Sequence, residues 1–185
     1  MKHILSAIIV SVFVVIATAF VAPNHAVAAS AAEINRDAEN ALKKLYAKSI
    51  KASALGEKAK AVLVFPSIIK GGFIVGGQYG EGVLLHKGKP VGYYNNVTAS
   101  YGLQAGIQKY GYALFFMTDA ALKYLDKSDG WELGTAPNIV IVDTGAAGGI
   151  STTSAQSDMF AFFFNQKGLM AGIGLQGTKI TKIEK

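Results

Sequence analysis

The sequence has 185 residues, 51% of them hydrophobic, with a formal net charge of +6, 21 glycines and no cysteine. The absence of cysteine excludes disulfides, thiolate metal sites and a lipid-anchored lipoprotein. Only one basic residue, Arg36, is an arginine. A surface rich in lysine and poor in arginine favours diffuse attraction to anionic surfaces over bidentate recognition of phosphates or bases.

The first 28 residues are predicted to be a signal peptide. Lys2 precedes an apolar run from Ile4 to Ala22, and Ala26-Val27-Ala28 matches an A-x-A cleavage site. An uncleaved membrane anchor is the alternative, because the run approaches the roughly 20 residues that span a bilayer. In either case residues 29–185 are expected to work outside the cytoplasm, in the periplasm or extracellularly. Their number suits one domain.

Residues 31 to about 59 are predicted to form one amphipathic helix. Ser30 and Glu33 have the spacing of a capping box at its start. One face carries small and apolar residues at helical spacing, namely Ile34, Ala38, Ala41, Leu42, Leu45, Ser49 and Ala52. A stripe about 100° away carries Lys44, Lys48 and Lys51, with Lys43 beyond it. This stripe is either a solvated face that complements the helix dipole or a basic face that meets an anionic membrane.

The chain beyond residue 60 has the period-two pattern and short apolar runs of β-strands. The expected strands are 61–65, 73–79, 83–86, 91–94, 101–117, 139–142, 159–164 and 169–173. The stretches "HKGKP" and "NQKG" are predicted to be hairpin turns, and Thr118 is expected to cap a short helix that ends near residue 125. The predicted fold class is α+β with a mostly antiparallel sheet.

Glycines recur four residues apart in the predicted strands. In 102–108 one face carries Gly102, Gln104, Gly106 and Gln108, and the other carries Leu103, Ala105 and Ile107. The apolar face is predicted to be core. The bare glycine face is predicted to let a helix, or else a ligand chain, approach closely. Such a sheet should coil strongly and could curl toward a barrel.

The sequence favours a protein that is not an enzyme. The nucleotide-binding pattern fails because "GGQYGEG" at 76–82 leads into another strand and not into a helix. His86 is the one histidine beyond residue 28, and the acidic residues are scattered. We therefore expect no catalytic residues, no metal site and no cofactor.

Three blocks of the sequence, at 59–85, 101–116 and 162–180, together resemble the SYLF domain family: "AKAVLVFPSIIKGGFIVGGQYGEGVLL", "YGLQAGIQKYGYALFF" and "FFFNQKGLMAGIGLQGTKI". The resemblance covers about residues 33–183. It implies a phospholipid-binding module, which in eukaryotic members binds acidic lipids. The chain has Gly145-Ala146-Ala147-Gly148-Gly149 where the family commonly shows Gly-Pro-x-Gly-Arg. Headgroup preference resting on that arginine therefore does not carry over.

The resemblance and the basic stripe together predict an exported, membrane-associated lipid-binding domain. The alternative is a structural or interaction protein of the envelope that binds acidic polymers or protein partners. Nucleic acid is not an expected partner for an exported chain with one arginine. The candidate lipid-binding residues are Lys43, Lys44, Lys48 and Lys51, with Lys58, Lys60 and Lys70 as weaker candidates.

Overall fold

A computed structural model describes residues 29–73, 75–101, 106–127, 131–132, 139–143, 157–168 and 178–185. The predicted signal peptide and the expected strand at 169–173 lie outside the described residues. The proposed boundary of the domain at residue 29 therefore stays a prediction.

The described strands form one eight-stranded sheet in the order β5-β8-β3-β2-β1-β4-β7-β6. The strands are β1 (Ala61–Phe73), β2 (Val75–His86), β3 (Lys89–Tyr101), β4 (Gly106–Phe116), β5 (Trp131–Glu132), β6 (Ile139–Asp143), β7 (Met159–Gly168) and β8 (Lys179–Ile183). The pairings are antiparallel except for the parallel pair β6 and β7. The predicted α+β class is confirmed. The two edge strands, β5 and β6, do not pair with each other, so closure into a barrel is not confirmed.

Two helices, α2 (Ala31–Lys48) and α3 (Ile50–Lys58), replace the single helix predicted from the sequence. Ser30 and Glu33 form the predicted capping box. Ser49 breaks the helix because its backbone is extended, with φ −134° and ψ 103°, and its side chain accepts a hydrogen bond from the Ala52 N–H at 3.2 Å. A serine that caps a second helix competes with continuation of the first.

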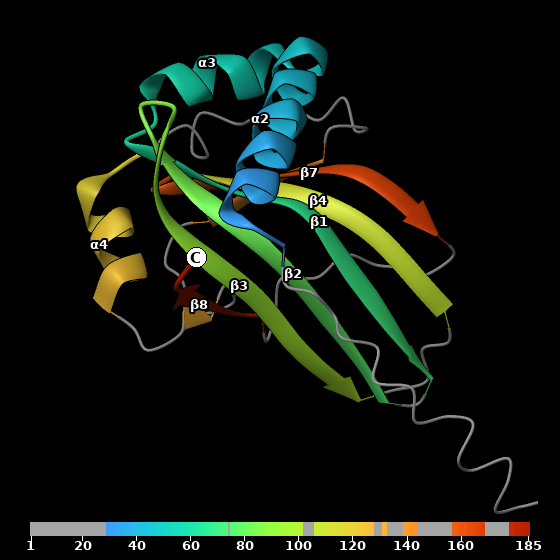
Figure 1. Ribbon diagram of the computed structural model, residues 1–185. Coiled ribbons are helices and arrows are strands. Elements are labelled where there is room, and N and C mark those ends of the chain that lie inside the picture. Colours follow the sequence, from blue (N-terminus) through green and yellow to red (C-terminus); the bar gives the residue numbers. More distant parts are fainter. Residues whose placement is uncertain are drawn as a thin grey trace, which may run out of the picture.

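Each face of the sheet packs against helices at the same end of the long strands. On one face, α2 and α3 bury Ile34, Ala38, Ala41, Leu42, Leu45 and Ala52 against Val62, Val64, Val83, Leu85, Ala113, Phe115 and Phe162. On the other, α4 (Asp119–Lys127) packs Ala121 and Leu125 onto Leu63, Phe65, Leu114 and Phe116. Figure 1 shows that β1 to β4 and β7 continue well past α2 toward the lower right. The helices therefore cover only part of the sheet.

Two turns were predicted, and one of them is wrong. Lys87 and Gly88 form the expected hairpin turn between β2 and β3, with φ of 49° and 77°. At "NQKG", however, β7 continues through Gly168. Asn165 adopts φ 56° where the pairing of β7 with β4 shifts register. Asparagine tolerates that conformation at a β-bulge as well as in a turn, which explains the misleading signal.

The predicted assignment of faces in β4 is also wrong. Gln108 is buried, with 5% of its surface exposed, whereas Ile107 is 72% exposed. Gln108 lies on the same side as the buried Tyr110 and Tyr112, because side chains two apart in a strand share a face. The core therefore lies on the side that was predicted to be bare.

Glycines do permit a close approach, but the element that approaches is β1 and not a helix. An added Cβ on Gly80 would lie 2.7 Å from the Ser67 carbonyl oxygen, and one on Gly111 would lie 2.8 Å from that of Pro66. These glycines flank the bulge at Phe65 and Pro66, where β1 shifts register against both neighbours. Gly106 has open space around it and needs glycine because its φ is 141°.

Candidate binding site

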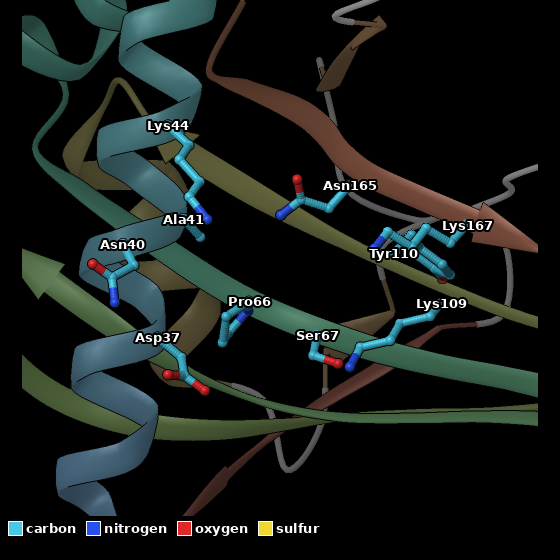
Figure 2. Close-up of a pocket in the computed structure, with 10 residues that line it drawn as sticks. All are labelled: Asp37, Asn40, Ala41, Lys44, Pro66, Ser67, Lys109, Tyr110, Asn165 and Lys167. Atoms are coloured by element: carbon cyan, nitrogen blue, oxygen red, sulfur yellow. The ribbon is translucent and has the colours of Figure 1, made fainter.

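A cleft of about 420 Å³ lies between the middle of α2 and the sheet. Four elements line it: Asp37, Asn40, Ala41 and Lys44 from α2, Pro66 and Ser67 from β1, Lys109 and Tyr110 from β4, and Asn165 and Lys167 from β7. Figure 2 shows the side chain of Lys44 running along α2 toward Ala41, and that of Lys109 directed toward Ser67. The volume is in the range that accepts a small polar ligand or a lipid headgroup.

The strand pairing explains why lysines meet at this cleft. Lys109 of β4 and Lys167 of β7 are directly opposite in the antiparallel register, so their side chains leave the same face of the sheet. Lys44 approaches from the helix above. Like charges directly across a strand pair destabilise a sheet. A cleft lined by one lysine from the helix and two from the sheet is therefore suited to an anion.

No described carboxylate neutralises these three lysines. Asp37, the acidic residue in the lining, already pairs with Arg36, whose Nε lies 3.1 Å from Asp37 Oδ1. The other ion pairs among the described residues are Lys60 with Asp119 and Lys185 with Glu81. The side chains of Asn40, Ser67 and Asn165 add amide and hydroxyl donors to the cleft. The chemistry of the lining thus suits a phosphate or carboxylate group.

The structure separates the lysines that the sequence grouped together. Lys44 lines the cleft, and Lys48 lines a smaller hollow of about 50 Å³ beside it, which shares Lys44 and Asn165. Lys43 is exposed on α2 outside these linings. Lys51 and Lys58 are exposed on α3, beyond the break at Ser49.

The remaining two candidates lie elsewhere. Lys60 pairs with Asp119 of α4 at 3.6 Å. Lys70 lies opposite Gln78 and Gln108, which places it on the sheet face away from α2. A single continuous stripe therefore does not form: of the predicted set only Lys44 lines the cleft, and Lys48 lines the smaller hollow beside it.

The residues that sequence reasoning missed are Lys109, Lys167, Ser67 and Asn165. The two lysines share one local feature in the sequence, because each follows a glutamine, in "IQKYG" and in "NQKGL". Lys109 and Lys167 lie opposite each other because of the register between β4 and β7, and the bulge at Asn165 sets that register.

The opposite face of the sheet holds a buried polar network. The Tyr110 hydroxyl donates to Gln78 Oε1 at 2.8 Å, and Gln78 Nε2 donates to Asn96 Oδ1 at 2.9 Å. Asn96 in turn donates to the Tyr112 hydroxyl. Burial raises the pKa of Tyr110 to about 12 and that of Tyr112 well above its usual range. Burial thus keeps these phenols neutral, and the network gives polar groups inside the core hydrogen-bond partners.

Metal-ligating side chains and apolar helices are the other features of the described part of the chain that bear on its function. Its histidine, aspartate and glutamate side chains form no cluster of three or more that could hold a metal ion. No helix in the described ranges has both the length and the apolar character needed to cross a bilayer.

A family model described as "Ysc84: Las17-binding protein actin regulator" matches residues 97–185. This match over residues 97–185 confirms the resemblance to the SYLF domain family found in the sequence, and that family is known as a lipid- and actin-related binding module. No curated protein matches the chain in sequence. The matched part of the SYLF domain contains Lys109, Asn165 and Lys167, whereas Lys44 and Ser67 precede it.

Proposed function

We propose that this SYLF domain is an exported, non-enzymatic phospholipid-binding protein that associates with the surface of anionic membranes. The observation that carries the proposal is the cleft in which Lys44, Lys109 and Lys167 converge with no described carboxylate paired to them. An ammonium group acts as a point charge toward a phosphate and does not demand one bidentate geometry. Recognition of a lipid phosphate therefore does not require the arginine that the family commonly has.

The helix lysines extend the same basic surface. Lys48 lies beside the cleft, and Lys43 and Lys51 are exposed nearby in sequence on α2 and α3. Each lysine close to an anionic bilayer contributes about 1 kcal/mol. In this proposal the cleft holds one headgroup while the outer lysines add attraction that salt can screen.

The test is sedimentation of the protein, purified from producing cells and delipidated, with vesicles of equal parts phosphatidylglycerol and phosphatidylcholine. The triple variant K44Q/K109Q/K167Q should bind about 100-fold more weakly, because three lysines at about 1 kcal/mol each correspond to roughly two factors of ten. The matched control K87Q/K89Q/K123Q removes the same charge from exposed positions outside the cleft. Equal loss in both variants would mean that net charge alone drives binding.

The alternative of an envelope protein that binds acidic polymers has a separate outcome. A protein that binds a soluble polyanion through these lysines but does not sediment with the anionic vesicles would contradict lipid binding and favour the alternative. The proposal of export has its own measurement: the mass of the protein recovered from the cell envelope should correspond to a chain that begins at Ala29.

A further inference from the structure

The half of the sheet face that α2 leaves uncovered carries a row of apolar side chains. Ile69 lies opposite Tyr79 in the pairing of β1 with β2, and Tyr79 lies opposite Val97 in the pairing of β2 with β3. Ile107 of β4 lies beside these three, one position further along the sheet face, opposite Gly71. We name Ile69, Tyr79, Val97 and Ile107 the apolar row.

The apolar row faces solvent on the same side as α2. Along β2, Tyr79 follows Leu85 and Val83 at period two, and both of those pack beneath the helices. Ile107 is 72% exposed, Ile69 56%, Tyr79 51% and Val97 43%. Gly71 and Gly77, which are paired with each other beside the row, add no side chains. The result is an exposed apolar surface across four neighbouring strands, and exposed patches of this kind mark interaction sites.

Cations border this surface at one end. Lys109 lies directly opposite Ile69, and Lys167 lies directly opposite Lys109. Both lysines also line the cleft, and Ser67 of the cleft lies two residues before Ile69 in β1, on the same face of the sheet. The cleft and the apolar row therefore form one continuous surface that is cationic where it meets α2 and apolar beyond it.

We propose that this surface docks onto an anionic phospholipid bilayer, with the apolar row entering the interfacial layer while Lys109 and Lys167 contact headgroups. The proposal rests on the proposed function and adds to it which face of the domain meets the membrane. The occupant is a bilayer because its chemistry is complementary in the same order: anionic headgroups outermost and apolar chains beneath. Tyrosine suits the boundary between them, since its ring is apolar and its hydroxyl polar.

The rival is docking through the helices, and the chain offers a matched probe for it. Ile50 at the start of α3 is 89% exposed and lies next to Lys51. Because the chain has no cysteine, I107C and I50C each create one labelling site on an exposed isoleucine. Each variant is labelled with a polarity-sensitive dye and mixed with vesicles of equal parts phosphatidylglycerol and phosphatidylcholine, some of which contain a nitroxide-labelled lipid.

The dye at residue 107 should shift to the blue on vesicle binding and be quenched by the nitroxide lipid, while the dye at residue 50 should change little. A response at residue 50 alone would overturn the proposal in favour of helix docking. Sedimentation with no response at either residue would overturn it in favour of adsorption by charge alone. A blue shift at residue 107 without vesicles, accompanied by a dimer in sedimentation equilibrium, would assign the surface to a second copy of the chain.

A second variant separates this proposal from the proposed function. I69N/I107N should lower vesicle affinity at high salt by about tenfold or more, because burial of an isoleucine contributes through apolar area that salt does not screen. Its unfolding midpoint should stay near that of the unmodified protein, since both side chains are exposed. If K44Q/K109Q/K167Q weakens binding and I69N/I107N does not, the lipid-binding function stands and sheet-face docking is wrong. If neither variant weakens binding, both fail.

Discussion

Gly80 gives the sharpest test of how the sheet is packed, because the added methyl group of Gly80→Ala would meet atoms that cannot move easily. Its Cβ would lie 2.7 Å from the Ser67 carbonyl oxygen, 2.8 Å from Ile68 Cγ1 and 3.2 Å from Ile68 Cα. Two of these atoms belong to the backbone of β1, and the side chain of Ile68 is fully buried. Overpacking of this kind costs about 1–3 kcal/mol.

Gly71 is the matched control for Gly80. It lies on the same pair of strands, and its added Cβ would meet nothing closer than 3.8 Å. Gly71→Ala should therefore be neutral or stabilise the fold by about 0.4–1 kcal/mol, through the lower entropy of the unfolded chain.

Urea unfolding of the delipidated protein is the assay. With a slope of about 2 kcal/mol per molar urea, Gly80→Ala should lower the midpoint by about 1 M and leave the slope unchanged, while Gly71→Ala should not lower it. Delipidated protein is needed because a ligand lost on mutation also lowers apparent stability. A midpoint for Gly80→Ala equal to or above that of Gly71→Ala would refute the conclusion that glycine is needed beside the bulge.

Two further predictions concern titration and the C-terminus. Burial raises the pKa of Tyr110 from 10.0 to about 12, so its contribution to stability is complete below pH 10 and is lost as the pH rises toward 12, where the unfolded tyrosine is already ionised. Tyr110→Phe should therefore reduce the loss of unfolding free energy between pH 9 and pH 12. An unchanged dependence of the unfolding free energy on pH would contradict the raised pKa of Tyr110. Lys185→Met should cost about 2 kcal/mol in thermal unfolding, because it leaves the Glu81 carboxylate, now 3.0 Å from Lys185 Nζ and 8% exposed, without its cation. The control Lys182→Met removes an exposed lysine of β8 and should change little.

The local structure of the chain was largely predictable from the sequence. The capping box at Ser30, the turn at Lys87 and Gly88, and the Thr118 cap of α4 all appear as expected, with Thr118 Oγ1 accepting from the Ala121 N–H at 3.2 Å. Each of these depends on residues within three or four positions of one another. The buried face of α2 was predictable for the same reason, because helical periodicity is a local property.

The errors arose where a local pattern had two solutions. Ser49 is compatible with the interior of one helix or with the N-cap of a second one. In the structure it is the N-cap, because its side chain accepts a hydrogen bond from the Ala52 N–H. Asn165 is compatible with a turn or with a β-bulge. In the structure it forms a bulge, because β7 continues to pair with β4 beyond it. The alternation at Ile107 and Gln108 is consistent with either face being buried.

The sequence by itself determined the fold class, the family and the presence of an excess of lysine. Only the tertiary structure decided which lysines line the same cleft. Lys44, Lys109 and Lys167 lie far apart along the chain and meet because α2 packs across β1 while β4 pairs with β7. It also decided that Ile69, Tyr79 and Ile107 face solvent and not the core. Register between distant strands fixes both results, since a shift by one residue would turn every side chain to the other face.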